Sequence, residues 1–197
     1  MITHFFFSLL LLTSTFAYLA AATTATAGDT DFIRTSCNTT LYPELCFSSL
    51  SRYATVVQRS PAHLARVAVA VALAKAHRTA AYLSCQTTAI EDDSGAAVRD
   101  CFDNMDDAVG EIRGSLHQLR RLGPESEPGS VRFGVSNVQT WMSAALTDEE
   151  TCTDGFEGVA EGTVKRDVCD RVTMVKKFTS NALALVNSFA NKEFGMP

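Results

Sequence analysis

Six cysteines are the residues of this chain most able to do chemistry. They are Cys37, Cys46, Cys85, Cys101, Cys152 and Cys169. Cys152 follows a run of short polar and acidic residues near the end of a predicted helix, and no histidine lies near it in the sequence. This setting indicates a disulfide to a neighbouring helix rather than a catalytic nucleophile, which needs a base beside it. No C-x-x-C pair occurs, so a zinc site is not expected.

The histidines and glycines of the chain match none of the common catalytic patterns. The four histidines are His4, His63, His77 and His117. None has an acidic residue three positions before it, as a di-iron helical bundle requires. The chain also lacks a His-Glu-x-x-His zinc motif, a phosphate-binding glycine loop and a Gly-x-Ser-x-Gly elbow. We therefore expect a protein that is not an enzyme and that uses no metal or cofactor.

Acidic residues form the main candidate surface. Four of them are spaced three, four and four residues apart: Asp100, Asp103, Asp107 and Glu111. This spacing places them in one stripe on a helix, and a second acidic group, the rim at Asp148-Glu149-Glu150, could frame the same end of the fold. Two interpretations remain open. The stripe is either an ordinary solvated face or a docking surface for a basic or polar partner.

Helical periodicity accounts for the rest of the chain after residue 60. Ser60 and Pro61 predict the cap and first turn of a helix over residues 62–83, and Ser94 and Ser130 predict the caps of two more. The third helix has an apolar stripe at Val131, Val135, Val138, Met142 and Ala145. A fourth helix begins near Val164. Four long helices joined by short connections predict an all-α, up-down-up-down four-helix bundle over residues 60–197.

A short helical hairpin is expected before the bundle, over residues 28–59. Two short helices would fold against each other at Tyr42-Pro43, and Cys37 and Cys46 lie nine residues apart on either side of that turn. A bridge between these two cysteines would close a small loop and stabilise the hairpin. The alternative is that they are free or paired differently.

The amino-terminal segment has the pattern of an export signal. Residues 1–27 contain no charged side chain, residues 5–16 are mostly apolar, and Ala25-Thr26-Ala27 fits a cleavage site. Cleavage after Ala22 is nearly as consistent with the sequence, and a membrane anchor is the alternative reading. We expect a secreted domain without membrane attachment, and Asn38-Thr39-Thr40 would then be a glycosylation sequon. The net charge of −5 argues against a nucleic acid partner.

Together these motifs resemble the plant invertase and pectin methylesterase inhibitor family over essentially the whole mature chain. The segments that carry the resemblance are Cys37-Asn-Thr-Thr-Leu-Tyr-Pro-Glu-Leu-Cys46, Cys101 within its helix, and Thr151-Cys152-Thr153-Asp154-Gly155-Phe156-Glu157. The resemblance implies a four-helix bundle preceded by a hairpin, with disulfides Cys37–Cys46 and Cys101–Cys152. It leaves Cys85 and Cys169 either paired with each other or as thiols. It also implies a protein that is not an enzyme.

Family resemblance further implies a partner and its contact residues. Members block either pectin methylesterase or acid invertase, and the invertase inhibitors have a Pro-Lys-Phe element. No proline here precedes a lysine, which favours pectin methylesterase in a one-to-one complex in the cell wall or apoplast. Acid invertase and a non-inhibitory helical interaction module remain the alternatives. The contact positions carried over by motif are Asp103, Asn104, Asp107, Thr151 and Asp154.

Overall fold

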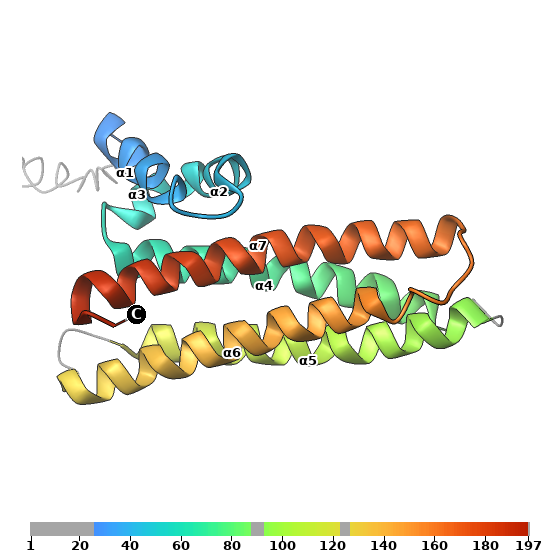
Figure 1. The fold of residues 1–197 in the computed structure, drawn as a ribbon. Coiled ribbons are helices and arrows are strands. Elements are labelled where there is room, and N and C mark those ends of the chain that lie inside the picture. Colours follow the sequence, from blue (N-terminus) through green and yellow to red (C-terminus); the bar gives the residue numbers. More distant parts are fainter. Residues whose placement is uncertain (1–25, 88–92, 123–126, 197) are drawn as a thin grey trace, which may run out of the picture.

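Four long helices and a smaller amino-terminal hairpin make up the structure (Figure 1). The computed structural model describes residues 26–87, 93–122 and 127–196. The elements are α1 (Ala27–Cys37), α2 (Pro43–Leu50), the 3-10 turn η1 (Ser51–Tyr53), α3 (Ala54–Val57), α4 (Pro61–Gln86), α5 (Asp93–Arg121), α6 (Pro128–Asp154) and α7 (Thr163–Phe194). Within those ranges there is no strand. The predicted all-α bundle with a preceding helical hairpin is confirmed.

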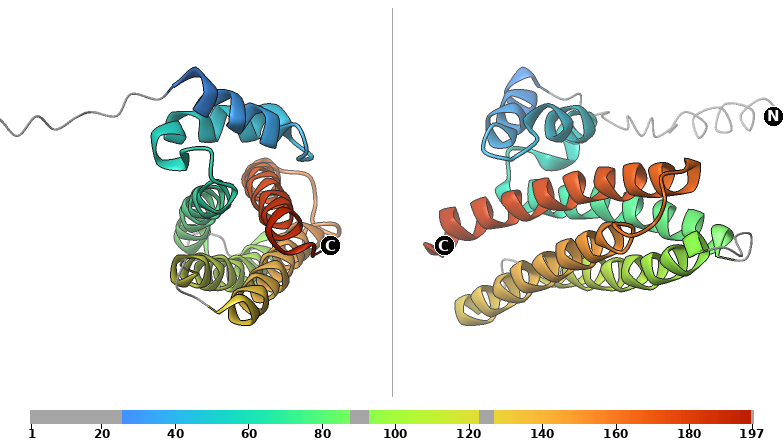
Figure 2. Two further views of the ribbon diagram at one scale, coloured as in Figure 1. Left: turned by 90° about the vertical axis from the view of Figure 1, so that its left-hand side faces the viewer. Right: turned by 45° about the vertical axis from the view of Figure 1, so that its right-hand side comes forward.

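The four long helices form a closed ring of neighbours. Each of α4, α5 and α6 packs against the next helix in the chain, and α7 packs back against α4. The end-on view in Figure 2 shows this arrangement, with the hairpin above α4 and α7 and with α5 and α6 on the opposite side of the bundle. The hairpin therefore covers one side of the bundle, whereas α5 and α6 present the other side to the surroundings.

The helix starts follow local rules, although two of the predicted caps are wrong. The Ser60 hydroxyl accepts a hydrogen bond from the His63 N–H at 3.2 Å, with Pro61 in the first turn, as predicted. Helix α6 instead begins at Pro128, so Ser130 lies inside it, because a proline already has the backbone φ angle of a first helical turn. Helix α5 begins at Asp93, one residue before the predicted cap Ser94. The connections at residues 88–92 and 123–126 lie outside the described residues.

One continuous apolar core lies between the helices. The predicted stripe of α6 faces it, with Val135, Val138, Met142 and Ala145 all fully buried and Val131 half-buried near the start of the helix. The other three long helices contribute buried residues at similar helical spacing. This packing fixes the rotation of each helix about its own axis and thereby decides which residues of α5 and α6 face outward.

Hydrogen bonds start the hairpin's first helix and join the hairpin to the bundle. Thr26 and Asp29 form a reciprocal capping box, in which each side chain accepts a hydrogen bond from the other residue's backbone N–H, at 3.3 and 3.0 Å. On α7, the Asn181 side chain accepts a hydrogen bond from the Tyr42 N–H at 3.1 Å and donates one to the Tyr42 carbonyl at 3.0 Å. This pair ties the turn between α1 and α2 to the bundle.

The predicted signal segment, residues 1–27, falls almost entirely outside the described residues, which start at Thr26. Ala27, its last residue, is already part of α1. None of the helices in the described part of the chain combines the length and apolarity needed to cross a bilayer.

Candidate functional site

Two disulfides are present among the described residues, and one of them links the two helices that contain the predicted contact residues. Cys37–Cys46 closes the hairpin with a Cα–Cα distance of 5.6 Å, and Cys101–Cys152 joins α5 to α6 with a Cα–Cα distance of 4.1 Å. Both pairings match those that the family resemblance implied. The second bridge holds the first third of α5 level with the end of α6, so residues flanking either cysteine lie on neighbouring helices at one height along the bundle.

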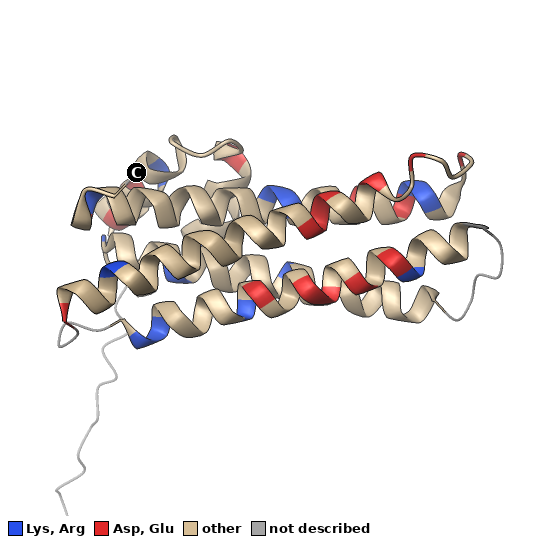
Figure 3. Ribbon diagram, turned by 60° about the horizontal axis from the view of Figure 1, so that its bottom comes forward, with Lys and Arg blue, Asp and Glu red and all other residues tan. Residues whose placement is uncertain are grey.

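The five predicted contact residues lie on both sides of this bridge. Asp103 and Asp107 on α5 are exposed, and Asn104 is half-buried and donates from its side chain to the Asp100 carbonyl at 2.8 Å. Thr151 and Asp154 near the end of α6 are also exposed. The structure therefore places all five on two adjacent helices, on the side of the bundle away from the hairpin. Figure 3 shows the acidic residues that run along this side.

Carboxyl groups from the two helices also meet between α5 and α6. Burial raises the pKa of Glu111 to about 7, and the Asp148 carboxyl, which accepts a hydrogen bond from it, and the charge of Asp107 add to the increase. The pKa of Asp148 is raised as well, chiefly by burial and also by Asp107. Glu111 is therefore turned toward α6 and is only partly solvated, unlike Asp103 and Asp107. The stripe on α5 thus continues onto α6 through the carboxyl groups of Glu111 and Asp148, and Glu111 titrates near pH 7.

The prediction of an acidic rim at residues 148–150 is wrong at Glu149, which does not lie at the surface. Its side chain is fully buried in the bundle, where its Oε1 atom accepts a hydrogen bond from the Thr179 hydroxyl of α7 at 2.7 Å. Its Oε2 atom has no hydrogen-bond partner among the described residues. Burial raises the pKa of Glu149 to about 8, although Thr179 and Lys176 act in the opposite direction. Of the three rim residues only Glu150 is exposed, and it pairs with Lys176 at 3.2 Å.

The sequence contained a signal for this buried glutamate. The apolar stripe of α6 runs through Val138, Met142 and Ala145, and the next steps of four and three residues reach Glu149 and Cys152. Both are buried in the structure. Extending the helical spacing past the last apolar residue would have placed Glu149 in the core, whereas its charge favoured the surface.

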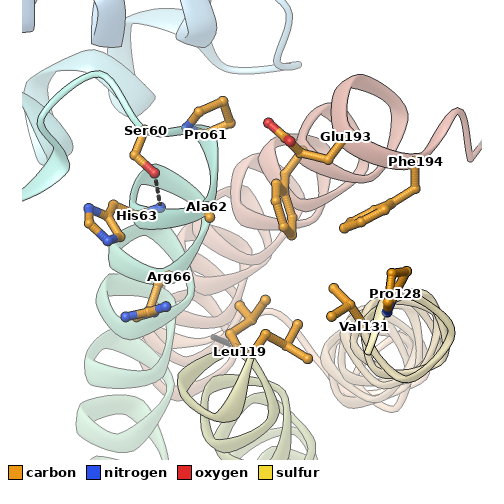
Figure 4. A pocket seen from close by; sticks show the side chains of 12 residues that line it. Ser60, Pro61, Ala62, His63, Arg66, Leu119, Pro128, Val131, Glu193 and Phe194 are labelled. Carbon is orange, nitrogen blue, oxygen red and sulfur yellow. Dashed lines mark hydrogen bonds between the residues drawn. The ribbon is translucent and has the colours of Figure 1, made fainter. Parts of the chain in front are cut away.

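A cavity of about 480 Å³ lies at the end of the bundle near the start of α4 (Figure 4). Its apolar walls include Leu119, Val131 and Phe194. Figure 4 shows the His63 ring on the side of α4 away from Val131 and Phe194. Among residues 26–87, 93–122 and 127–196, no group of three or more His, Cys, Asp or Glu side chains could hold a metal ion.

The remaining predicted sites involve two cysteines and one asparagine. Cys85 lies at the surface and Cys169 is half-buried, and neither belongs to the two bridges. Burial raises the pKa of the Cys169 thiol, which keeps it protonated and weakly nucleophilic. Asn38 is exposed at the carboxyl end of α1, so its side chain is accessible for glycosylation, which stays a prediction.

Comparisons with known proteins agree with this arrangement. A family model described as plant invertase/pectin methylesterase inhibitor matches residues 31–185. The chain is 40% identical over 165 residues to pectinesterase inhibitor 11 of Arabidopsis thaliana, covering 82% of each chain. It is 39% identical over 191 residues to pectinesterase inhibitor 9 of the same plant, covering 94% of each, and 38% identical over 188 residues to a 21 kDa protein of Daucus carota, covering 94% of this chain and 96% of that one.

Solved structures show the same fold. The crystal structure of a mutant form of a pectin methylesterase inhibitor from Arabidopsis superimposes with a TM-score of 0.62 at 22% sequence identity. The match covers 79% of this chain and 95% of that one.

Proposed function

The chain belongs to the plant invertase/pectin methylesterase inhibitor family, and we propose that it is a secreted inhibitor that binds plant pectin methylesterase and occludes its pectin-binding cleft. The observation that carries this proposal is the identity of 39–40% to two pectinesterase inhibitors over 82% or more of the chain. The family model matches residues 31–185, which include all four disulfide cysteines and the segments that present the candidate surface.

The family consists of inhibitors of plant invertase and pectin methylesterase, which are not enzymes themselves. This confirms the expectation that the chain has no catalytic activity of its own. Inhibition must then come from binding alone, through a surface that the fold holds rigidly.

The surface proposed for this contact is the α5–α6 face with Asp103, Asn104, Asp107, Thr151 and Asp154. Four of these residues are exposed, and all lie on regular helices next to the Cys101–Cys152 bridge. A rigid surface needs little ordering when it binds, which favours affinity. A specific one-to-one complex of this kind would bury about 1,200–2,000 Å² in total.

Acid invertase is the alternative target, because the family description includes invertase inhibitors. The Pro-Lys-Phe element expected of invertase inhibitors is absent from the sequence. The nearest match, Lys177-Phe178, lies within α7, where Phe178 is buried and Lys177 lies over the Tyr42 ring. This pair could not enter an active site without unfolding the helix, so pectin methylesterase is the favoured target.

Location in the cell wall or apoplast is part of the same proposal. It rests on the signal pattern of residues 1–27, on the two disulfides, and on the target, whose substrate is a wall polysaccharide.

The test is an inhibition assay with the purified chain, without residues 1–25, against a panel of plant pectin methylesterases and acid invertases. We expect pectin methylesterase to be inhibited at acidic and neutral pH, and the inhibition to weaken as the pectin concentration rises, because both ligands compete for one cleft. Inhibition of invertase alone would show that acid invertase, and not pectin methylesterase, is the target. If neither class of enzyme were blocked, the protein would instead be a non-inhibitory interaction module.

A further inference from the structure

One part of this acidic protein has basic side chains and no acidic ones. Residues 45–90 contain no Asp or Glu, although the whole chain has a net charge of −5. The same residues contain five cations, Arg52, Arg59, Arg66, Lys75 and Arg78. In the structure this segment forms the second half of the hairpin and helix α4, on the side of the bundle away from the acidic residues of α5 and α6 (Figures 2 and 3).

Three of these cations line a groove between the hairpin and α4. The groove has a volume of about 510 Å³ and is bounded by η1 and α3 on one side and by one face of α4 on the other. Arg52 lies on the hairpin side, and Lys75 and Arg78 lie on the α4 side. No carboxylate belongs to its lining. A volume of this size is within the range of about 300–1,000 Å³ that small-ligand sites occupy.

The positive charge in this groove is not neutralised by the protein. The ion pairs found in the described part of the chain include none of Arg52, Lys75 and Arg78. Two of the cations lie against aromatic rings instead: Arg52 is 4.9 Å from the Tyr53 ring centroid, and Lys75 is 4.9 Å from that of Phe178. These rings hold the cations in place without cancelling their charge, so the groove attracts anions.

Apolar surface lies between the charges. Val56, on the hairpin side, is 56% exposed although it is a large aliphatic residue. Opposite it, Ala70 and Ala74 occur at a spacing of four residues on α4, where their small side chains leave the groove open. A ligand that fits must combine carboxylates or similar anions with C–H-rich faces that can cover this apolar strip.

We propose that this groove binds a segment of an acidic polysaccharide of the polyuronate class, the form that pectin takes when its methyl esters are removed. Each sugar ring of such a chain has a carboxylate, which arginine binds in a two-pronged geometry, and has apolar faces that can lie on Val56 and the alanines. This inference rests on the proposed function, which places the inhibitor beside pectin. The inhibitor would thereby stay attached to charged pectin while its opposite face binds the enzyme.

The test measures binding by calorimetry, without any enzyme, between the purified chain and an oligogalacturonate. The fully methyl-esterified oligomer is the uncharged control, and polyglutamate represents an acidic protein partner. In the groove variant, Arg52→Gln, Lys75→Gln and Arg78→Gln are combined. In the matched control variant, Arg120→Gln, Arg121→Gln and Arg132→Gln remove the same charge from exposed positions on α5 and α6.

We expect the unmodified chain to bind the oligogalacturonate with an affinity that falls as salt increases, and to bind neither the esterified oligomer nor polyglutamate comparably. The groove variant should lose at least about tenfold in affinity, and the control variant less than about threefold. Equal losses in the two variants, equal binding of polyglutamate, or absence of oligogalacturonate binding would each overturn the proposal.

A second readout separates this inference from the proposed function. Both variants are assayed as inhibitors of pectin methylesterase with fully esterified pectin, which has no free carboxylates when the reaction starts. Undiminished inhibition by the groove variant, together with its lost oligogalacturonate binding, supports two independent surfaces. Inhibition without any oligogalacturonate binding would overturn the groove alone, and binding without inhibition would overturn the proposed function alone.

Discussion

A carboxyl group deprived of water holds its proton more tightly, and Glu149 is the clearest case in this protein. Its neighbours come from three helices: Asp148 on its own helix, Glu111 on α5, and Lys176 and Thr179 on α7. Burial dominates over the hydrogen bond from Thr179 and raises the pKa from its ordinary 4.5 to about 8. The folded protein therefore binds a proton that the unfolded chain has already released at mildly acidic pH.

This difference predicts that the free energy of unfolding falls as pH rises from about 4.5 to about 8. Below this window the carboxyl is protonated in both states, and its stabilising contribution is fully present. Within it only the folded state keeps the proton, and the contribution is lost at a slope of up to about 1.4 kcal/mol per pH unit. Urea unfolding measured across this pH range gives the slope directly.

The variant Glu149→Gln should flatten this pH dependence and be more stable than the wild type at pH 8. The amide oxygen can still accept the Thr179 hydrogen bond, and the side chain no longer ionises. Glu150→Gln is the matched control, because Glu150 is exposed and should leave the slope unchanged. An unaltered slope in Glu149→Gln would show that Glu149 is not the titrating group.

At the scale of the helices, the two disulfides constrain the unfolded chain to different degrees. Cys37–Cys46 closes a separation of nine residues within the hairpin, whereas Cys101–Cys152 closes one of 51 residues between two long helices. Because the entropy removed from the unfolded chain grows with loop length, we predict losses of about 2.5 and about 4 kcal/mol when the two bridges are replaced by serine pairs. Chemical unfolding of the two double variants tests the order.

The reverse order, or free thiols at Cys101 and Cys152 in non-reducing peptide mapping, would contradict this prediction.

Two glycines within the helices give a paired prediction on packing. Gly110 is exposed on α5, and a Cβ atom there would meet nothing within 4 Å, so Gly110→Ala should raise the free energy of unfolding by about 0.5–1 kcal/mol. Gly134 is buried on α6, and its Cβ would lie 2.5 Å from Gln118 Nε2 and 2.9 Å from Leu122 Cδ2. Gly134→Ala should therefore stabilise less or destabilise. Equal gains in thermal stability would refute the close packing of α5 and α6 there.

The sequence predicted the helices better than their ends. Apolar spacing located the stripe of α6 and the four-helix arrangement, since burial repeats over many turns and tolerates local exceptions. The predictions of Ser130 and Ser94 as caps were wrong because a short polar residue is compatible with several positions in a first turn. At α6, Pro128 determines where the helix begins. The fold could thus be predicted from periodicity. A helix start could not, because it depends on which of several neighbouring residues occupies the first turn.

On the scale of the whole molecule, two groups of like charge lie on different sides of the bundle. The α5–α6 side has Asp103 and Asp107 exposed, and the groove between the hairpin and α4 has three cations, Arg52, Lys75 and Arg78, that take part in none of the ion pairs found among the described residues. We predict that Asp103→Lys combined with Asp107→Lys slows association with pectin methylesterase and reduces its salt dependence. Exposed charges act mainly by steering the encounter and are screened beyond about 10 Å at 0.1 M salt.

The matched control is Asp31→Lys combined with Glu44→Lys, which makes the same change of charge at exposed positions on the hairpin. Stopped-flow association rates at several salt concentrations compare the two. If both pairs of substitutions slowed association equally, only the net charge would matter. The acidic stripe of α5 would then be an ordinary solvated face and not a docking surface.

The candidate site was only partly predictable. The acidic spacing of α5 indicated an exposed stripe, and Asp103 and Asp107 are exposed. The sequence did not show that Glu111 turns toward Asp148, because this depends on how α5 and α6 are rotated against each other. The burial of Glu149 was missed although the apolar spacing of α6 reaches it, because its charge favoured the surface. The groove at the hairpin likewise requires the fold, since Arg52 and Arg78 are brought together across η1 and α4.

The Cys101–Cys152 bridge makes the backbone from residue 101 to residue 152 a covalently closed ring. A protease that cut once within the connection between α5 and α6 would therefore release no fragment. The two pieces would stay joined through sulfur, and the core contacts between the helices would remain. Such a nicked molecule should migrate as one band before reduction and as two after it. A single backbone cut in this connection should therefore not abolish function.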